Sequence, residues 1–178
     1  MLFVYIDDIL AVLHKATDDI KEITAFYMAK EGRIKPPEIY IGVNIMRVQM
    51  PDGREVWGSS PREYGKNAVI KVEGLFEEYG DGYTLRNIVK AQLPLGYKQE
   101  LDVTEELWTD LASQYLQLFG ICRWEVEIGR VDILLEVYLL SQYQAGPRLG
   151  HMEVLYNVFS YLKNHKDMGK LAYDSKTP

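Results

Sequence analysis

The stretch LFVYIDDILAVL, residues 2–13, places two adjacent carboxylates, Asp7 and Asp8, between two apolar runs. Both runs are rich in β-prone residues, so the pattern predicts two strands joined by a tight hairpin at the acids. Because Asp is common in turns, a solvated turn is one interpretation. The other interpretation, that the two acids bind a cation, follows from how the strands should pack. Strands that are apolar on both faces should be buried, and two carboxylates at their junction would repel and raise each other's pKa.

A bound divalent cation would remove that cost, and Mg²⁺ favours a few carboxylates together with substrate phosphates. Two-metal sites use such carboxylates for phosphoryl transfer, and they need at least one more acid from a neighbouring strand. A helical Asp-Asp-x-x-Asp motif that holds diphosphates is excluded, because position 11 is Ala11 and the flanks favour strands.

Composition limits the class of protein. The chain has 178 residues and a net charge of −6, and it is long enough to bury a core. It contains no apolar run of the ~20 residues that a membrane helix needs. The absence of a secretory pattern and the single cysteine, Cys122, lead us to expect a cytoplasmic protein with a buried, unreactive thiol. The acidic balance argues against autonomous nucleic-acid binding by charge alone.

Strands mixed with one helix, followed by mostly helices, predict an α+β fold. In the first half we expect a helix from Thr17 to about Lys30 with Ile20, Ile23 and Tyr27 inward, a strand over Ile39–Ile45, and a hairpin through Pro51-Asp52-Gly53. A helix from Ser60 to Tyr79 and a loop over 81–101 should follow. The second half should contain a helix from Asp102, helices over 131–143 and 148–163, and a strand near 170–173.

The segment Phe3–Leu10 closely resembles the Tyr-x-Asp-Asp box of reverse transcriptases, in the form found in copia-type retrotransposon polyproteins. Further segments resemble the same family in family order over most of the chain. They are Tyr40–Ile45 with the turn at Pro51-Asp52-Gly53, Gly120–Trp124, Gly129–Ile133, Leu140–Tyr143 with Pro147 and His151, and Tyr161–Lys163.

The resemblance implies an RNA-directed DNA polymerase that transfers nucleotides from a dNTP to a primer 3′-hydroxyl with two Mg²⁺ ions. Asp7 and Asp8 would be two of its three catalytic, metal-binding aspartates, and Tyr5 would lie near the incoming nucleotide. Arg54 and Trp57 would belong to the region that grips the primer. Its partners would be an RNA or DNA template-primer and the dNTP.

The resemblance also divides the chain. Residues 1–58 would form the C-terminal half of a polymerase palm, 59–101 the first thumb helix and a loop, and 102–178 a helical thumb and connection. There Lys163 could contact phosphate oxygens. In the family, the fingers and the first catalytic Asp precede the box and a ribonuclease H follows, so we expect this segment alone to be inactive. The complete element would reside in a cytoplasmic virus-like particle.

Other interpretations remain open. The chain could be a non-catalytic remnant of a decayed element, or a domain that binds a partner protein. It could also be an unrelated two-metal nuclease or nucleotidyltransferase, in which case Asp52 or Asp132 would have to lie close to the acid pair. For Arg130 and Asp132 themselves, a structural ion pair is the favoured expectation. The three histidines show no metal-ligand spacing.

Overall fold

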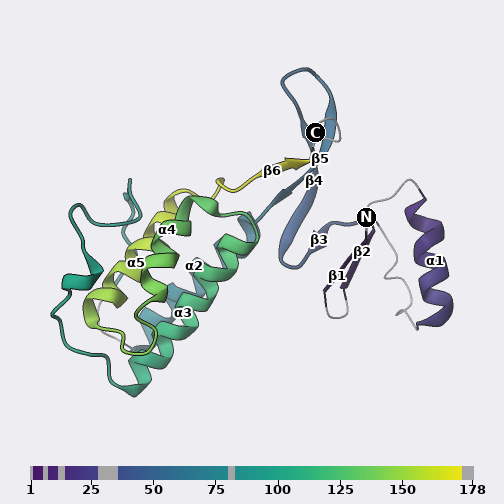
Figure 1. Ribbon diagram of the computed structural model, residues 1–178. Coiled ribbons are helices and arrows are strands. Elements are labelled where there is room, and N and C mark those ends of the chain that lie inside the picture. The colour runs from purple at the N-terminus through teal and green to yellow at the C-terminus, as the bar shows by residue number, and fades with distance from the viewer. Residues whose placement is uncertain (1, 6–7, 12–14, 28–35, 80–82, 174–178) are drawn as a thin grey trace.

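The computed structural model describes residues 2–5, 8–11, 15–27, 36–79 and 83–173. Within them the chain is α+β, with two antiparallel sheets and five α-helices. Figure 1 shows helices α2, α3, α4 and α5 gathered in a helical body, the larger sheet extending from it, and the first hairpin with α1 beyond that sheet. No helix in the described part is long and apolar enough to cross a membrane.

The first hairpin has the predicted form. Strands β1 (Leu2–Tyr5) and β2 (Asp8–Ala11) pair antiparallel, with Tyr5 opposite Asp8. Its expected burial is wrong for Ile9, which is 43% exposed, while Leu10 and Ala11 are half-buried. Helix α1 (Ala16–Phe26) is shorter than predicted, and Tyr27, expected to point inward, is mostly exposed. The described side chains of this hairpin and of α1 are therefore not fully buried.

The larger sheet has the order β3-β4-β5-β6, with strands β3 (Ile39–Tyr40), β4 (Val43–Gln49), β5 (Glu55–Ser60) and β6 (Leu171–Tyr173). The single strand predicted over Ile39–Ile45 is wrong, because the chain reverses at Ile41 and Gly42. Their φ angles are +47° and +88°, as a tight two-residue hairpin turn of the I′ kind requires. A Cβ on Gly42 would lie 3.2 Å from the Tyr64 ring, so glycine also permits the close approach of α2.

The helical body contains α2 (Arg62–Tyr79), α3 (Thr109–Glu127), α4 (Leu134–Ser141) and α5 (Leu149–Asn164), with 3₁₀ turns η1 (Gln99–Leu101) and η2 (Val131–Ile133). Three predicted elements are confirmed: the helix after Ser60 is α2, the last helix is α5, and the strand near 170–173 is β6 of the larger sheet. The core includes the fully or nearly fully buried residues Val72, Tyr115, Leu118, Cys122, Ile133, Leu140, Leu155, Val158, Phe159 and Leu162.

The helix predicted from Asp102 is present as α3, but its predicted start is wrong, because the helix begins at Thr109. The Asp102 carboxylate instead accepts hydrogen bonds from the backbone N–H of Thr104 (2.9 Å) and from its hydroxyl (2.6 Å). This local turn competes with helix formation, as short polar side chains often do. The Thr104 hydroxyl oxygen in turn accepts from the Gly150 N–H (2.9 Å), so the turn supports the start of α5.

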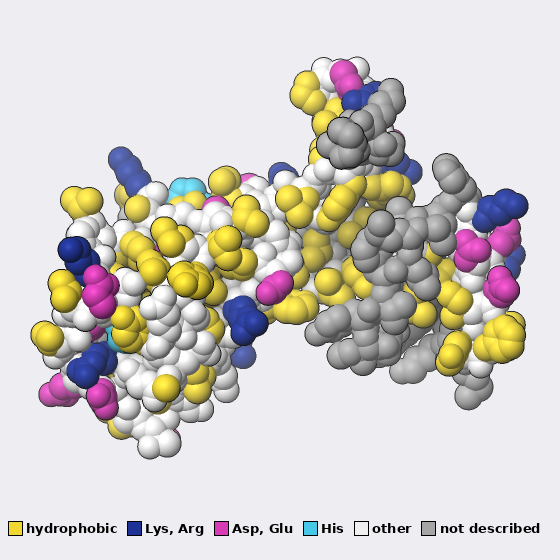
Figure 2. All heavy atoms as spheres, viewed as in Figure 1, with side chains coloured by type: hydrophobic (Ala, Val, Ile, Leu, Met, Phe, Trp, Pro, Cys, Tyr) yellow, Lys and Arg dark blue, Asp and Glu magenta, His cyan; other side chains and the backbone are white. Residues whose placement is uncertain are grey.

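Helix α4 buries an acid and exposes several apolar residues, although its Val137 and Leu140 lie in the core. Its one carboxylate, Glu136, is 6% exposed, whereas Leu134, Leu135 and Tyr138 are all more than half exposed. Hydrophobic side chains are visible on the surface of the helical body in Figure 2. A surface helix normally exposes its charged residues and turns its apolar residues toward the core.

Candidate functional site

The tip of the first hairpin carries the residues that the sequence singles out. Tyr5 ends β1, Asp8 begins β2, and the two are cross-strand partners. Asp7, the other predicted catalytic and metal-binding residue, lies outside the described residues, as do the side chains of Tyr5 and Asp8. The structure therefore brings the backbone of Tyr5 and Asp8 together at the hairpin end. The sequence predicts this hairpin with its turn at Asp7 and Asp8, whereas the structure makes Asp8 the first residue of β2.

Arg54 and Trp57 lie on the β4–β5 hairpin. The Arg54 Nε is 2.5 Å from Asp52 Oδ2, and the Arg54 backbone N–H donates to Asp52 Oδ1 (3.1 Å). The guanidinium of Arg47 stacks over the Trp57 ring at 3.8 Å, a cation–π contact. Trp57 is 37% exposed, so part of its ring remains available for contact on the sheet surface.

Lys163 has acceptors within the fold. Its Nζ donates to Glu73 Oε1 (2.9 Å) and to Asn87 Oδ1 (3.1 Å), which ties α5 to α2 and to the following loop. Figure 1 shows α5 well apart from the β1–β2 hairpin. The structure thus does not bring Lys163 together with Tyr5 and Asp8, and a phosphate would have to compete with two acceptors for its Nζ.

The two acids that an unrelated metal enzyme would need are occupied elsewhere. Asp52 pairs with Arg54, and Asp132 accepts from Arg130 Nε (2.9 Å) and Nη2 (2.8 Å). Burial raises the pKa of Asp132, but the hydrogen bonds and charge of Arg130 outweigh it and keep that pKa below its ordinary value. The predicted structural ion pair is confirmed. Among the residues that the structure describes, no three His, Cys, Asp or Glu side chains gather to hold a metal ion.

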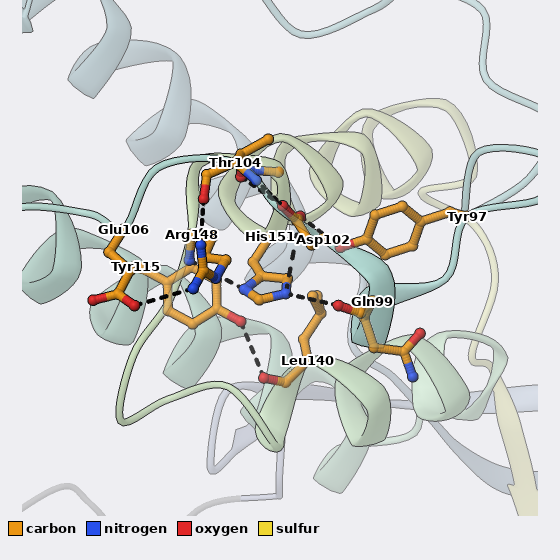
Figure 3. Close-up of polar contacts among 10 residues, drawn as sticks. Tyr97, Gln99, Asp102, Thr104, Glu106, Tyr115, Leu140, Arg148 and His151 are labelled. Carbon is orange, nitrogen blue, oxygen red and sulfur yellow. Dashed lines mark hydrogen bonds and ion pairs between the residues drawn. The ribbon is translucent and has the colours of Figure 1, made fainter.

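A second polar network, drawn in Figure 3, lies at the start of α5. His151 is 1% exposed, and its Nδ1 accepts from the Arg148 backbone N–H (3.1 Å). Because Nδ1 is an acceptor, we assign the proton to Nε2, which faces the Gln99 carbonyl (3.4 Å) and Asp102 Oδ2 (3.9 Å). This histidine closes the first turn of α5 and serves the fold. Sequence reasoning found it only through the family resemblance.

A groove of about 560 Å³ lies between the loop after α2 and helix α5. Its lining includes Tyr97, whose hydroxyl donates to Asp102 Oδ2 (3.4 Å). Burial first, and then the Asp102 charge, raise the pKa of Tyr97 well above its ordinary value, so this phenol stays neutral. Nothing in the sequence predicts the groove, because residues 81–101 lack periodicity.

Comparisons with protein-family models, with curated proteins and with solved structures gave no match for this chain.

Proposed function

We propose that the chain is the part of a copia-type reverse transcriptase that extends from the Tyr-x-Asp-Asp box through the thumb. The observation that carries the proposal is the hairpin in which Tyr5 pairs with Asp8. It puts the box at the junction of two short antiparallel strands, which is the arrangement that the resemblance implies. The β4–β5 hairpin and the helical body follow in the order expected for primer grip and thumb.

The donor set suits Mg²⁺ in kind, because Asp7 and Asp8 offer the hard carboxylate oxygens that this ion prefers. When bound, the ions would activate the primer 3′-hydroxyl and stabilise the leaving pyrophosphate. The part of this chain is to hold the two carboxylates at the hairpin end, beside Tyr5. The third carboxylate is assigned to a palm segment upstream of the box.

The β4–β5 hairpin would contact the primer strand. The partly exposed Trp57 ring, held by Arg47, offers an aromatic surface for a base or sugar. Arg54 would reach phosphate only by exchanging its bond with Asp52. With a net charge of −6, the chain gains little from counterion release, so the proposed function needs the rest of the polymerase for tight template-primer binding.

The test is complementation. The chain is combined with a purified upstream half of a copia-type polymerase, and Mg²⁺-dependent extension of a primed RNA template is measured. We expect extension with both halves and none with either half alone. Asp7→Asn and Asp8→Asn should each abolish it, whereas Asp18→Asn, which removes an exposed carboxylate in the first turn of α1, should not.

Extension that persists in Asp7→Asn would remove this residue from the mechanism and overturn the proposal. Absence of extension with a folded upstream half would also count against it, and would favour the non-catalytic alternatives.

A further inference from the structure

Glu125 carries a fully buried carboxyl group. It lies near the end of α3, and none of its surface is exposed. Neither of its oxygens finds a partner within the described ranges. A buried carboxylate in that state is strongly disfavoured, whereas the neutral acid is much less so.

The surroundings of Glu125 come from three directions. Helix α2 contributes Tyr64 and Gly65, and a Cβ on Gly65 would lie only 2.9 Å from Glu125 Oε1. Helix α3 itself contributes Cys122, and the segment after it contributes Arg130 and Asp132. Burial raises the pKa of Glu125 to about 7; the Arg130 charge opposes this rise and the Asp132 charge adds to it.

Arg130 does not neutralise Glu125 by direct pairing, because its Nε and Nη2 already bond both oxygens of Asp132. With both acids ionised, Glu125, Asp132 and Arg130 would carry one uncompensated negative charge. With Glu125 protonated, the three groups together are neutral. The neutral state matches the buried, closely packed arrangement around Gly65.

The contact around Glu125 also supports the larger sheet. Tyr64 and Trp124, the sequence neighbours of Gly65 and Glu125, both face Gly42 in the β3–β4 turn, where a Cβ would lie 3.2 Å from the Tyr64 ring and 3.9 Å from Trp124 Nε1. A change at Glu125 is therefore one residue away from the place where the turn packs on α2 and α3.

We propose that Glu125 is a proton-dependent latch between α2 and α3. The protonated carboxyl keeps the contact closed as in the structure. Release of its proton to solvent leaves a buried negative charge that draws in water, loosens α2 from α3 and frees the β3–β4 turn. This inference is independent of the proposed polymerase function.

The direction of the pH effect follows from linkage. The ordinary pKa of Glu125 is 4.5, and the folded chain raises it to about 7. Between these values the unfolded chain has released its proton while the folded chain retains it, so stability falls as pH rises through this window and levels off above it. Each unit of pKa difference is tenfold in the folding constant, so the expected loss is on the order of a hundredfold.

The experiment measures urea unfolding of the full chain from pH 5 to pH 8, together with amide hydrogen exchange corrected for its intrinsic pH dependence. We expect the folding constant to fall about a hundredfold, and segments 39–44, 62–66 and 121–126 to lose protection. Glu125→Gln should flatten both trends. Glu127→Gln changes an exposed acid on the same helix and should retain them.

A Glu125→Gln chain whose stability declines with pH as steeply as the wild type would overturn the latch. If that variant does not fold, infrared spectroscopy of the wild type decides. A carbonyl band of a protonated carboxyl group at pH 6 that disappears by pH 8 supports the proposal, and absence of the band at pH 6 contradicts it.

Discussion

Lys163 and Glu73 form an ion pair that joins two helices of the body, with 2.9 Å between Nζ and Oε1. The residues lie on α5 and α2, and Asn87 on the following loop is the second acceptor for the same ammonium group. The side chains are 33% and 40% exposed. The position predicted to contact phosphate therefore has a partner that stabilises the packing of α5 on α2.

Replacing Lys163 by Gln is expected to lower the free energy of unfolding by about 0.5 kcal/mol, because partly exposed ion pairs contribute little. Chemical denaturation of Lys163→Gln, Glu73→Gln and the double variant measures the coupling between them. A matched change of an exposed lysine, Lys66→Gln, tests whether loss of one charge by itself lowers affinity for a primed template. If Lys163→Gln weakens that affinity much more than Lys66→Gln does, Lys163 contacts nucleic acid after all.

The sequence was sufficient for elements whose local signals agree with their packing. The helix predicted over 148–163 is α5, and it places Val154, Leu155, Val158 and Leu162 in the core, because their spacing of one, three and four fits one helical face. Helix α4 shows the limit of that reasoning. Its inner face combines Glu136 with Val137 and Leu140 while Leu134 and Leu135 are exposed, so hydrophobic periodicity alone does not identify that face.

The candidate site likewise has features that the sequence predicts and features that it does not. The first hairpin was predictable from two β-prone runs with a short link, but its register was not, because Asp8 pairs with Tyr5 as the first residue of β2 and does not lie in the turn. The partners of Lys163 and Arg47 were not predictable, because they depend on which strands and helices meet in the folded chain. The Glu125 contact with Gly65 joins residues on different helices, and nothing in either segment alone indicates it.

Removing Arg130 should be costly. The Arg130 side chain is 2% exposed and holds both oxygens of Asp132, so Arg130→Met leaves a partly buried carboxylate uncompensated. We expect a loss of about 3 kcal/mol in the free energy of unfolding at pH 7, measured by urea denaturation. The double variant Arg130→Met/Asp132→Leu should recover much of that loss, because neither charge is then left alone. A single-variant loss below about 1 kcal/mol would contradict a structural role for this pair.

The same ion pair predicts a dependence on acid. The folded chain lowers the pKa of Asp132 below its ordinary value of 3.8. The stability that this carboxylate contributes is therefore fully present above pH 3.8 and is lost as pH falls through the folded-state pKa. In Arg130→Met this acid-side loss should shrink, because the group that lowers the pKa is gone. Unfolding curves between pH 2 and pH 5 measure the difference.

The turn at Ile41 offers a stabilising substitution. A β-branched residue at a φ of +47° is strained, because its Cβ crowds the following carbonyl oxygen, whereas Asn tolerates this conformation and is favoured in two-residue hairpin turns. Ile41→Asn should raise the free energy of unfolding by about 1 kcal/mol, less whatever burial of the half-buried Ile41 contributes. Thermal and urea denaturation measure the gain.

The matched control is Ile39→Asn. Ile39 is a strand residue two positions earlier that is 65% exposed, and its φ angle is not positive. At position 39, Asn relieves no backbone strain and lowers β-propensity, so Ile39→Asn should leave the free energy of unfolding unchanged or lower it slightly. A destabilised Ile41→Asn chain would show that the packing of the Ile41 side chain outweighs its backbone strain, and that the β3–β4 turn is held by contacts with the body instead of by turn chemistry.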